Sequence, residues 1–186
     1  MSQTSTPAGT SATGRAGEFE EIYRANVGAI TAYFARRGRD PNLVADLTAD
    51  TFVEAIRSFG GFDPRRGTAR AWLFGIARRV YAQHLERSAS TEAAARHLAG
   101  RRELDVDEVD ELVHRIDAER GGRLLMRRWQ RLPQTDRSAI ELVDIVGLTP
   151  KEAAAVLGLS PGALRIRLFR ARTKLRTAAR EDTSDE

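Results

Sequence analysis

Apolar residues recur at intervals of three and four along the first half of the chain, the spacing that gathers side chains on one face of an α-helix. The first such stripe predicts a helix ending near Gly38 and consists of Phe19, Ile22, Tyr23, Val27, Ile30 and Phe34. A second helix is expected to start at Asp40 and Pro41, a cap followed by proline, with a stripe of Leu43, Leu47, Phe52, Ala55, Ile56 and Phe59. Thr68 opens a third, whose inward residues are Trp72, Leu73, Ile76, Val80, Tyr81 and Leu85. Three amphipathic helices of this length close a small bundle.

The clearest start and stop signals lie at residues 149–158. Thr149 precedes Pro150 and stands three residues before Glu152, so an N-cap, a proline in the first turn and a capping box coincide. An alanine-rich helix is expected from there to Gly158, a residue that adopts a positive φ without steric cost. The pattern predicts a short helix with a sharp corner at its end.

A second cap and proline, Ser160 and Pro161, begin the last predicted helix. Its apolar face is Leu164, Leu168, Ala171 and Leu175. Its other faces carry Arg165, Arg167, Arg170, Arg172, Lys174, Arg176 and Arg180. Small residues in the preceding helix, Ala154 especially, let the two helices cross closely. A solvated or membrane-surface basic helix would not need both caps and the glycine corner, so the pattern favours a helix-turn-helix that places its second helix in a major groove.

The segments between these helices set the expected domain limits. Residues 1–16 are rich in Ser, Thr, Gly and Ala without periodicity and are predicted to be a disordered tail. Residues 88–122 are alanine-rich, then acidic, and end at a glycine pair. A linker is the favoured interpretation of 88–122, ahead of a docking strip or an acidic helix that mimics nucleic acid.

A second bundle is expected to begin after that glycine pair, Gly121 and Gly122. Its first apolar residues are Leu125, Trp129 and Leu132, after which Pro133 interrupts. Thr135 is then predicted to cap a helix that carries Ile140, Val143 and Val146 up to Gly147. The expected fold is all-α, with two small helical bundles at 17–87 and 123–180, a flexible linker and an acidic tail at 181–186.

Composition excludes several function classes. The 186 residues include 30 basic and 26 acidic side chains, a net charge of only +4, so the cationic helix matters through its distribution of charge. The absence of cysteine rules out disulfides, cysteine-ligated zinc and a thiol nucleophile. No apolar run approaches the roughly 20 residues of a membrane span, and the N-terminus lacks the features of a signal peptide. A cytoplasmic protein with no cofactor and no metal is expected.

An enzyme using Asp46, Asp50 or His84 as acid or base is the least favoured class. No convergent third group, glycine-rich phosphate loop or metal-ligand set accompanies these residues in the sequence. We therefore expect binding and no catalytic residue.

Four motifs together suggest a family. They are DLTADTF at 46–52, ARAWLFGIARRVYAQHLER at 69–87, RLPQTDRSAIELVDIVGLTPKEAAAVLG at 131–158 and LSPGALRIRLFRARTKLR at 159–176. Their order and spacing resemble the extracytoplasmic-function group of bacterial RNA polymerase sigma factors, members of the sigma-70 family that keep only regions two and four. The similarity runs from about Phe19 to Arg176, the linker excepted. It implies a sigma factor whose partners are core RNA polymerase, promoter DNA as duplex and melted strand, and an anti-sigma factor.

The resemblance also implies which residues bind. The polymerase-binding set is Asp46, Leu47, Asp50, Thr51 and Phe52. Among these, Asp46 and Asp50 are the expected exposed contacts, whereas Leu47 and Phe52 also suit the core. For the melted strand of the downstream box the set is Phe62, Arg65, Arg66, Arg70, Arg78 and Arg79, with Trp72 assigned to the core. For the upstream box it is Ser160, Gly162, Arg165, Ile166, Arg167, Phe169 and Arg170.

Three positions depart from the family pattern and leave the promoter sequence open. Ala49 stands where many relatives have glutamine, Arg79 where many have asparagine, and Ile166 where a serine is common. The alternative function is an autonomous helix-turn-helix regulator, with residues 19–87 as a dimerisation or ligand domain. Such a regulator would give a palindromic footprint without polymerase.

Overall fold

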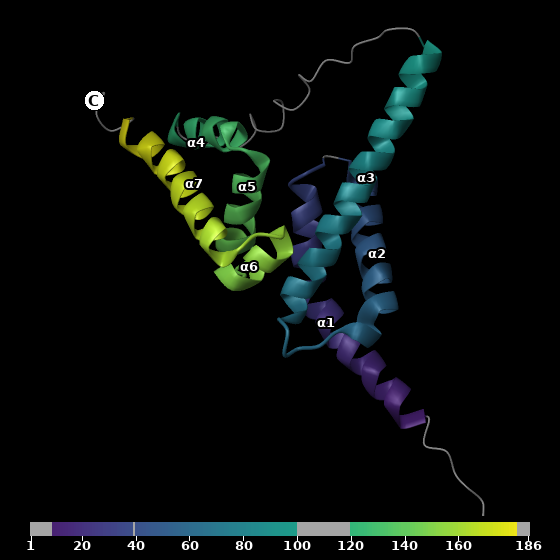
Figure 1. Ribbon diagram of the computed structural model, residues 1–186. Helices are drawn as coiled ribbons and strands as arrows, with labels where there is room; N and C mark the ends of the chain where they lie inside the picture. Colours follow the sequence, from purple (N-terminus) through teal and green to yellow (C-terminus); the bar gives the residue numbers. More distant parts are fainter. Residues whose placement is uncertain (1–8, 39, 100–119, 182–186) are drawn as a thin grey trace, which may run out of the picture. The chain divides into compact units, whose positions relative to one another are not determined.

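The computed structural model describes residues 9–38, 40–99 and 120–181, and these contain helices and no strand. The predicted all-α fold is confirmed (Figure 1). The elements are α1 (Gly9–Ala35), α2 (Pro41–Ser58), the 3-10 turn η1 (Phe59–Gly61), α3 (Ala69–Ala99), α4 (Arg120–Arg131), α5 (Gln134–Ile140), the π-helical turn η4 (Glu141–Ile145), α6 (Pro150–Leu157) and α7 (Pro161–Glu181). The chain forms two compact units, Met1–His84 and Leu85–Glu186, so the boundary falls within α3.

Helices α1, α2 and α3 form the core of the first unit. Its most deeply buried side chains include Ile30, Phe34, Leu73 and Phe74, each at most 1% exposed. The ring of Tyr33 on α1 meets Phe74 on α3 edge to face, with centroids 5.4 Å apart. Burying a side chain of this size stabilises a fold by about 1.5–3 kcal/mol, so the α1 and α3 stripes hold the unit together.

Helix α2 begins as predicted but buries a slightly different stripe. Oδ1 of Asp40 accepts a hydrogen bond from the backbone N–H of Asn42 at 2.9 Å, which confirms the cap. Thr48 and Thr51 are buried, and Ile56, assigned to the core from the sequence, is 61% exposed. The threonine hydroxyls donate to carbonyls one turn back, at 2.7 and 2.8 Å. Because this satisfies their only polar group, threonines fill core positions that hydropathy assigns to surface.

Two helices are longer than the sequence predicted. Helix α1 begins at Gly9, within the predicted disordered tail, and α3 continues to Ala99, within the predicted linker at 88–122. The α3 extension is alanine-rich, and a helix already nucleated by buried residues propagates cheaply through such sequence. The α1 extension, rich in Gly, Ser and Thr, has no such local preference and continues the helix that begins its buried stripe at Phe19. Leu85, expected to face inward, is 45% exposed. The remainder of the predicted linker, 100–119, and residues 1–8 and 182–186 lie outside the described residues.

In the second unit α7 packs against α4, α5 and α6. The first residues of two helices, α4 and α5, differ from the prediction. Gly121 and Gly122 lie in the first turn of α4, and α5 begins at Gln134, directly after Pro133. Pro133 itself supplies the extended backbone before the helix, with φ −52° and ψ 142°, so Thr135 is not the cap.

Candidate functional site

The start of α6 and the corner between α6 and α7 have the predicted geometry. Oγ1 of Thr149 accepts from the N–H of Glu152 at 3.3 Å, and Oε2 of Glu152 accepts from the N–H of Thr149 at 2.9 Å. This reciprocal pair is a capping box. Gly158 has a φ of +67°, the left-handed conformation that favours glycine. The two helices are therefore held at a defined corner by local chemistry.

We expect Thr149→Ala to destabilise the second unit by about 1 kcal/mol, the usual value of a lost N-cap. Thr149→Ser keeps the hydroxyl and should retain most of that stability. Urea unfolding followed by circular dichroism measures the difference. Equal midpoints for the Ala and Ser variants would show that the capping box contributes nothing.

Helix α7 buries the face expected of it. Leu164, Leu168 and Ala171 are at most 4% exposed, and Ala154 of α6 is 1% exposed, as the predicted close crossing requires. Oγ of Ser160 accepts from the N–H of Ala163 at 3.2 Å, which confirms the second cap. The opposite side of α7 is thereby turned to solvent.

Two arginines of α7 are bonded within the second unit. Nη1 of Arg167 lies 3.2 Å from Oδ1 of Asp136 and donates to Oγ1 of Thr135 at 3.1 Å. Asp136 is buried, with its side chain 10% exposed. Arg167 compensates a buried carboxylate and thereby orients α7 in this conformation, and its expected role as a base reader stays a prediction.

Arg172 forms the second of these bonds. Its guanidinium makes a two-pronged contact with Asp144 of η4, with Nε donating to Oδ2 at 3.1 Å and Nη2 meeting Oδ1. This hydrogen bonding, together with the charge of Asp144, raises the pKa of Arg172 above its ordinary value, and desolvation opposes the rise. Arg172 therefore stays charged and tied to η4.

We expect Arg167→Ala to destabilise the second unit by about 1–3 kcal/mol, because it leaves the buried Asp136 without its partner. Arg165→Ala is the matched control, since it removes the same charge from an exposed position of α7. Urea unfolding of the two variants measures the contrast. Equal stability of both would contradict a structural role for Arg167.

The outer face of α7 consists of Arg165, Ile166, Phe169 and Arg170, all exposed. Arg165 and Arg170 form no ion pair with other residues in the described parts of the chain. Ser160 and Gly162 lie exposed at the start of the same helix, where backbone N–H groups favour an anion. The arrangement offers cations, apolar groups and amides on one surface.

An aromatic stack holds the loop between α2 and α3. Phe62 lies against Trp72 with ring centroids 5.0 Å apart and against Phe59 at 6.1 Å, and Phe59 in turn meets Phe19 of α1 at 5.2 Å. All four rings are half-buried. Trp72, assigned to the core from the sequence, is thus only partly covered, and Phe62 is braced by neighbouring rings.

Five arginines lie on the loop and on α3, the two elements that carry Phe62 and Trp72. Arg65 and Arg66 are exposed in the loop, and Arg78 and Arg79 are exposed on α3. Arg70 is half-buried, and its Nε has no hydrogen-bond partner among the described residues. Cationic side chains on the elements that carry aromatic rings suit unstacked bases and their backbone.

The sequence did not indicate Arg15, which the structure brings to the same loop. A Cβ placed on Gly60 would lie 3.2 Å from Nη2 of Arg15, so this side chain reaches the loop from the N-terminal part of α1. Arg15 fell in the predicted tail because its neighbours show no apolar period. Only the extension of α1 to Gly9 places it there.

The outer face of α2 carries carboxylates and apolar side chains. Asp46 and Asp50 are exposed as expected, whereas Leu47, Thr51 and Phe52 are at most 5% exposed and lie in the core of the unit. Direct contact of these three residues with polymerase stays a prediction. The α2 outer face also includes Val53, which the sequence did not single out, and Ile56, which the sequence assigned to the core; they are 44% and 61% exposed.

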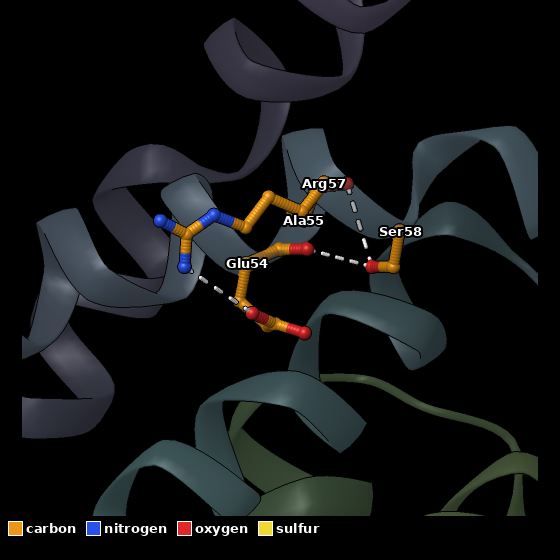
Figure 2. Close-up of polar contacts among 4 residues, drawn as sticks. All are labelled: Glu54, Ala55, Arg57 and Ser58. Carbon is orange, nitrogen blue, oxygen red and sulfur yellow. Dashed lines mark hydrogen bonds and ion pairs between the residues drawn. The ribbon is translucent and has the colours of Figure 1, made fainter.

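The last turn of α2 borders this face (Figure 2). Nη1 of Arg57 lies 4.0 Å from Oε2 of Glu54, and Oγ of Ser58 donates to the Glu54 carbonyl at 2.7 Å and to the Ala55 carbonyl at 3.5 Å. These contacts satisfy the end of the helix without covering Ile56. The α2 outer face is therefore an apolar pair flanked by carboxylates.

The described residues contain no cluster of His, Asp and Glu arranged to hold a metal ion. None of their helices is long and apolar enough to cross a membrane.

Comparison with known proteins gives consistent matches to both units. Residues 22–91 match the family model Sigma-70 region 2, and residues 122–175 match Sigma-70, region 4. The chain is 30% identical to the RNA polymerase sigma factor CarQ of Myxococcus xanthus over 165 residues, which cover 85% of this chain and 87% of CarQ. It is 24% identical to the ECF RNA polymerase sigma factor SigM of Bacillus subtilis over 167 residues, which cover 90% of this chain and 98% of SigM.

A solved structure has a similar fold. It is the sigma factor RpoE from Bartonella quintana, crystallised in complex with the anti-sigma factor NepR. The TM-score is 0.63 at 20% sequence identity, and the match covers 88% of this chain and 97% of that one.

Proposed function

Because this chain belongs to the extracytoplasmic-function group of RNA polymerase sigma factors, within the sigma-70 family, we propose that its two units hold the two boxes of a promoter for core RNA polymerase. The protein binds core polymerase and directs initiation at specific promoters. We assign region two to α1, α2 and α3 and region four to α4 to α7, close to the ranges 17–87 and 123–180 expected from the sequence. The observation that carries this division is the exposed cationic face of α7, opposite its buried stripe.

Region four grips the upstream box as duplex DNA. Arg165 and Arg170 on its outer face have no internal partner in the described chain, so they are available to guanine edges or phosphates. Ser160 and Gly162 present the amide end of α7 to a phosphate. Arg167 and Arg172 hold α7 in place through their bonds to Asp136 and Asp144.

Region two uses the loop between α2 and α3 for the melted downstream strand. Phe62, braced by Trp72, offers a ring to an unstacked base, and Arg65, Arg66, Arg70, Arg78 and Arg79 line the path of the backbone. Arg15 is added to that set because it reaches the loop at Gly60. Base stacking is worth about 1–3 kcal/mol per base, enough to favour the open strand.

The α2 outer face docks on core polymerase. Asp46 and Asp50 supply negative charge, and Val53 and Ile56 supply the apolar centre of a protein interface. An anti-sigma factor is the regulator we propose, and this same face is the surface it would have to cover. A factor with these partners works in the cytoplasm and performs no catalysis of its own.

Because the two units are parts of one chain, the whole protein binds a promoter more tightly than either unit would alone. Each unit alone binds its box weakly, but once one is bound the other finds its box at a high effective concentration. The promoter is thus recognised through two boxes at a set spacing.

Footprinting with and without polymerase tests this division of roles. We expect the purified chain to protect no promoter sequence by itself, and the complex with core polymerase to protect an upstream duplex box and expose a downstream melted strand to permanganate. A palindromic footprint from the chain alone would instead favour the autonomous regulator. That alternative has no support from the relatives, which are named as sigma factors.

A further inference from the structure

The outer face of α7 has an apolar centre between its two arginines. Ile166 and Phe169 are 54% and 66% exposed. They stand three residues apart and so are neighbours on one side of the helix. Arg165 and Arg170 flank them, since five residues at 3.6 per turn are separated by about 140° around the axis. The face is therefore apolar in the middle and cationic at both edges.

These two apolar side chains lie outside the buried core of the second unit. The buried stripe of α7, Leu164, Leu168 and Ala171, lies on the other side of the helix. Large apolar groups left in water next to cations indicate a partner that covers them. Because the cations are the border of the patch, the partner must be anionic at its rim and apolar within.

Duplex DNA has this pattern in its major groove, where phosphates line the rims. The C5-methyl of thymine is the apolar group presented among the base edges. The segment from Arg165 to Arg170 rises about 7.5 Å along α7, the height of roughly two base-pair steps. One apolar pair can thus cover the methyl groups of neighbouring pairs.

Building on the proposed function, we propose that Ile166 and Phe169 read thymine methyl groups at the centre of the upstream box, between base pairs contacted by Arg165 and Arg170. Ile166 occupies the position where serine is common in the family, so it replaces a hydrogen-bonding group by an apolar one. The upstream box then contains at least one A·T pair, whose thymine is on either strand, next to the pairs that the arginines contact.

The test removes single methyl groups from the DNA. A promoter defined by run-off transcription is synthesised with deoxyuridine in place of each thymine of the upstream box, which leaves every hydrogen bond unchanged. At one or two positions we expect the holoenzyme to bind about fourfold more weakly, the value of burying one methyl-sized group. In Ile166→Ala or Phe169→Ala holoenzyme the same replacement should have no effect.

Ile145→Ala is the matched control, because Ile145 is a 52% exposed isoleucine of the same unit outside α7. This variant should keep the full fourfold sensitivity to uridine. Unchanged unfolding midpoints of all three variants would show that the fold is intact.

The outcomes separate this inference from the function on which it rests. A holoenzyme that initiates at the promoter but is indifferent to every uridine overturns methyl reading and leaves the sigma function standing. So does a uridine effect that persists in both Ile166→Ala and Phe169→Ala, or an upstream box without thymine on either strand. A holoenzyme that initiates at no promoter overturns both.

Discussion

Replacing Arg165 and Arg170 together by alanine is expected to lower promoter-specific initiation about 100-fold or more. Each arginine that grips a guanine edge in two places contributes about 1–3 kcal/mol of discrimination, and each 1.4 kcal/mol is a factor of ten. The two side chains are exposed, so the fold should be unaffected. Run-off transcription with reconstituted holoenzyme measures the effect, while binding to core polymerase should stay at its wild-type value.

The control for charge is Arg127→Ala with Arg131→Ala, two exposed arginines of α4 in the same unit. This control removes the same amount of positive charge as the α7 double variant, but from outside the α7 outer face. We expect it to lower initiation far less than the α7 double variant does. Salt dependence then separates the two roles of an arginine. A phosphate contact lowers the salt slope by about one when it is lost, whereas a base contact changes the preferred sequence. Equal initiation by the α7 double variant and the α4 control would refute the assignment of α7 as the reader.

Introducing Val53→Asp and Ile56→Asp together should weaken binding to core polymerase about 30-fold or more. A hot-spot side chain near the centre of an interface contributes about 2 kcal/mol or more when it is truncated, and a carboxylate there also brings a desolvation cost. Because both residues are exposed in the free chain, α2 should remain folded. Affinity for core polymerase, measured by fluorescence anisotropy of the labelled chain, is the readout.

Leu85→Asp is the matched control, since Leu85 is an exposed apolar residue of α3, 45% accessible, outside the α2 outer face. It should bind polymerase as the wild type does. If the α2 variant retains wild-type affinity, docking does not use this face, and Asp46 and Asp50 lose their proposed role with it.

The helix-turn-helix was predictable because its signals are local. The Thr149 capping box, Gly158 at the corner and the Ser160 cap each act within a few residues, and all three appear in the structure as expected. Periodicity likewise located the buried face of α7. Local hydrogen bonding and side-chain spacing are the physical features that sequence alone expresses most directly.

The side-chain roles that could not be predicted from the sequence depend on tertiary contacts. The Arg167 bond to Asp136 joins residues 31 positions apart, so nothing near Arg167 distinguishes it from Arg165. Thr51 looked polar and proved buried because its hydroxyl bonds within α2, and this rotated the exposed stripe toward Ile56. Arg15 became visible only through the longer α1. Each case is a side chain whose role is set by a partner outside its own motif.

The most direct test of the account is run-off transcription from genomic DNA with core polymerase, in the presence and absence of this protein. We predict transcripts that begin at defined promoters only when the protein is present, and that are lost with the Arg165→Ala, Arg170→Ala variant although it still binds polymerase. Wild-type protein that binds core polymerase and yields no promoter-specific transcript would contradict the account.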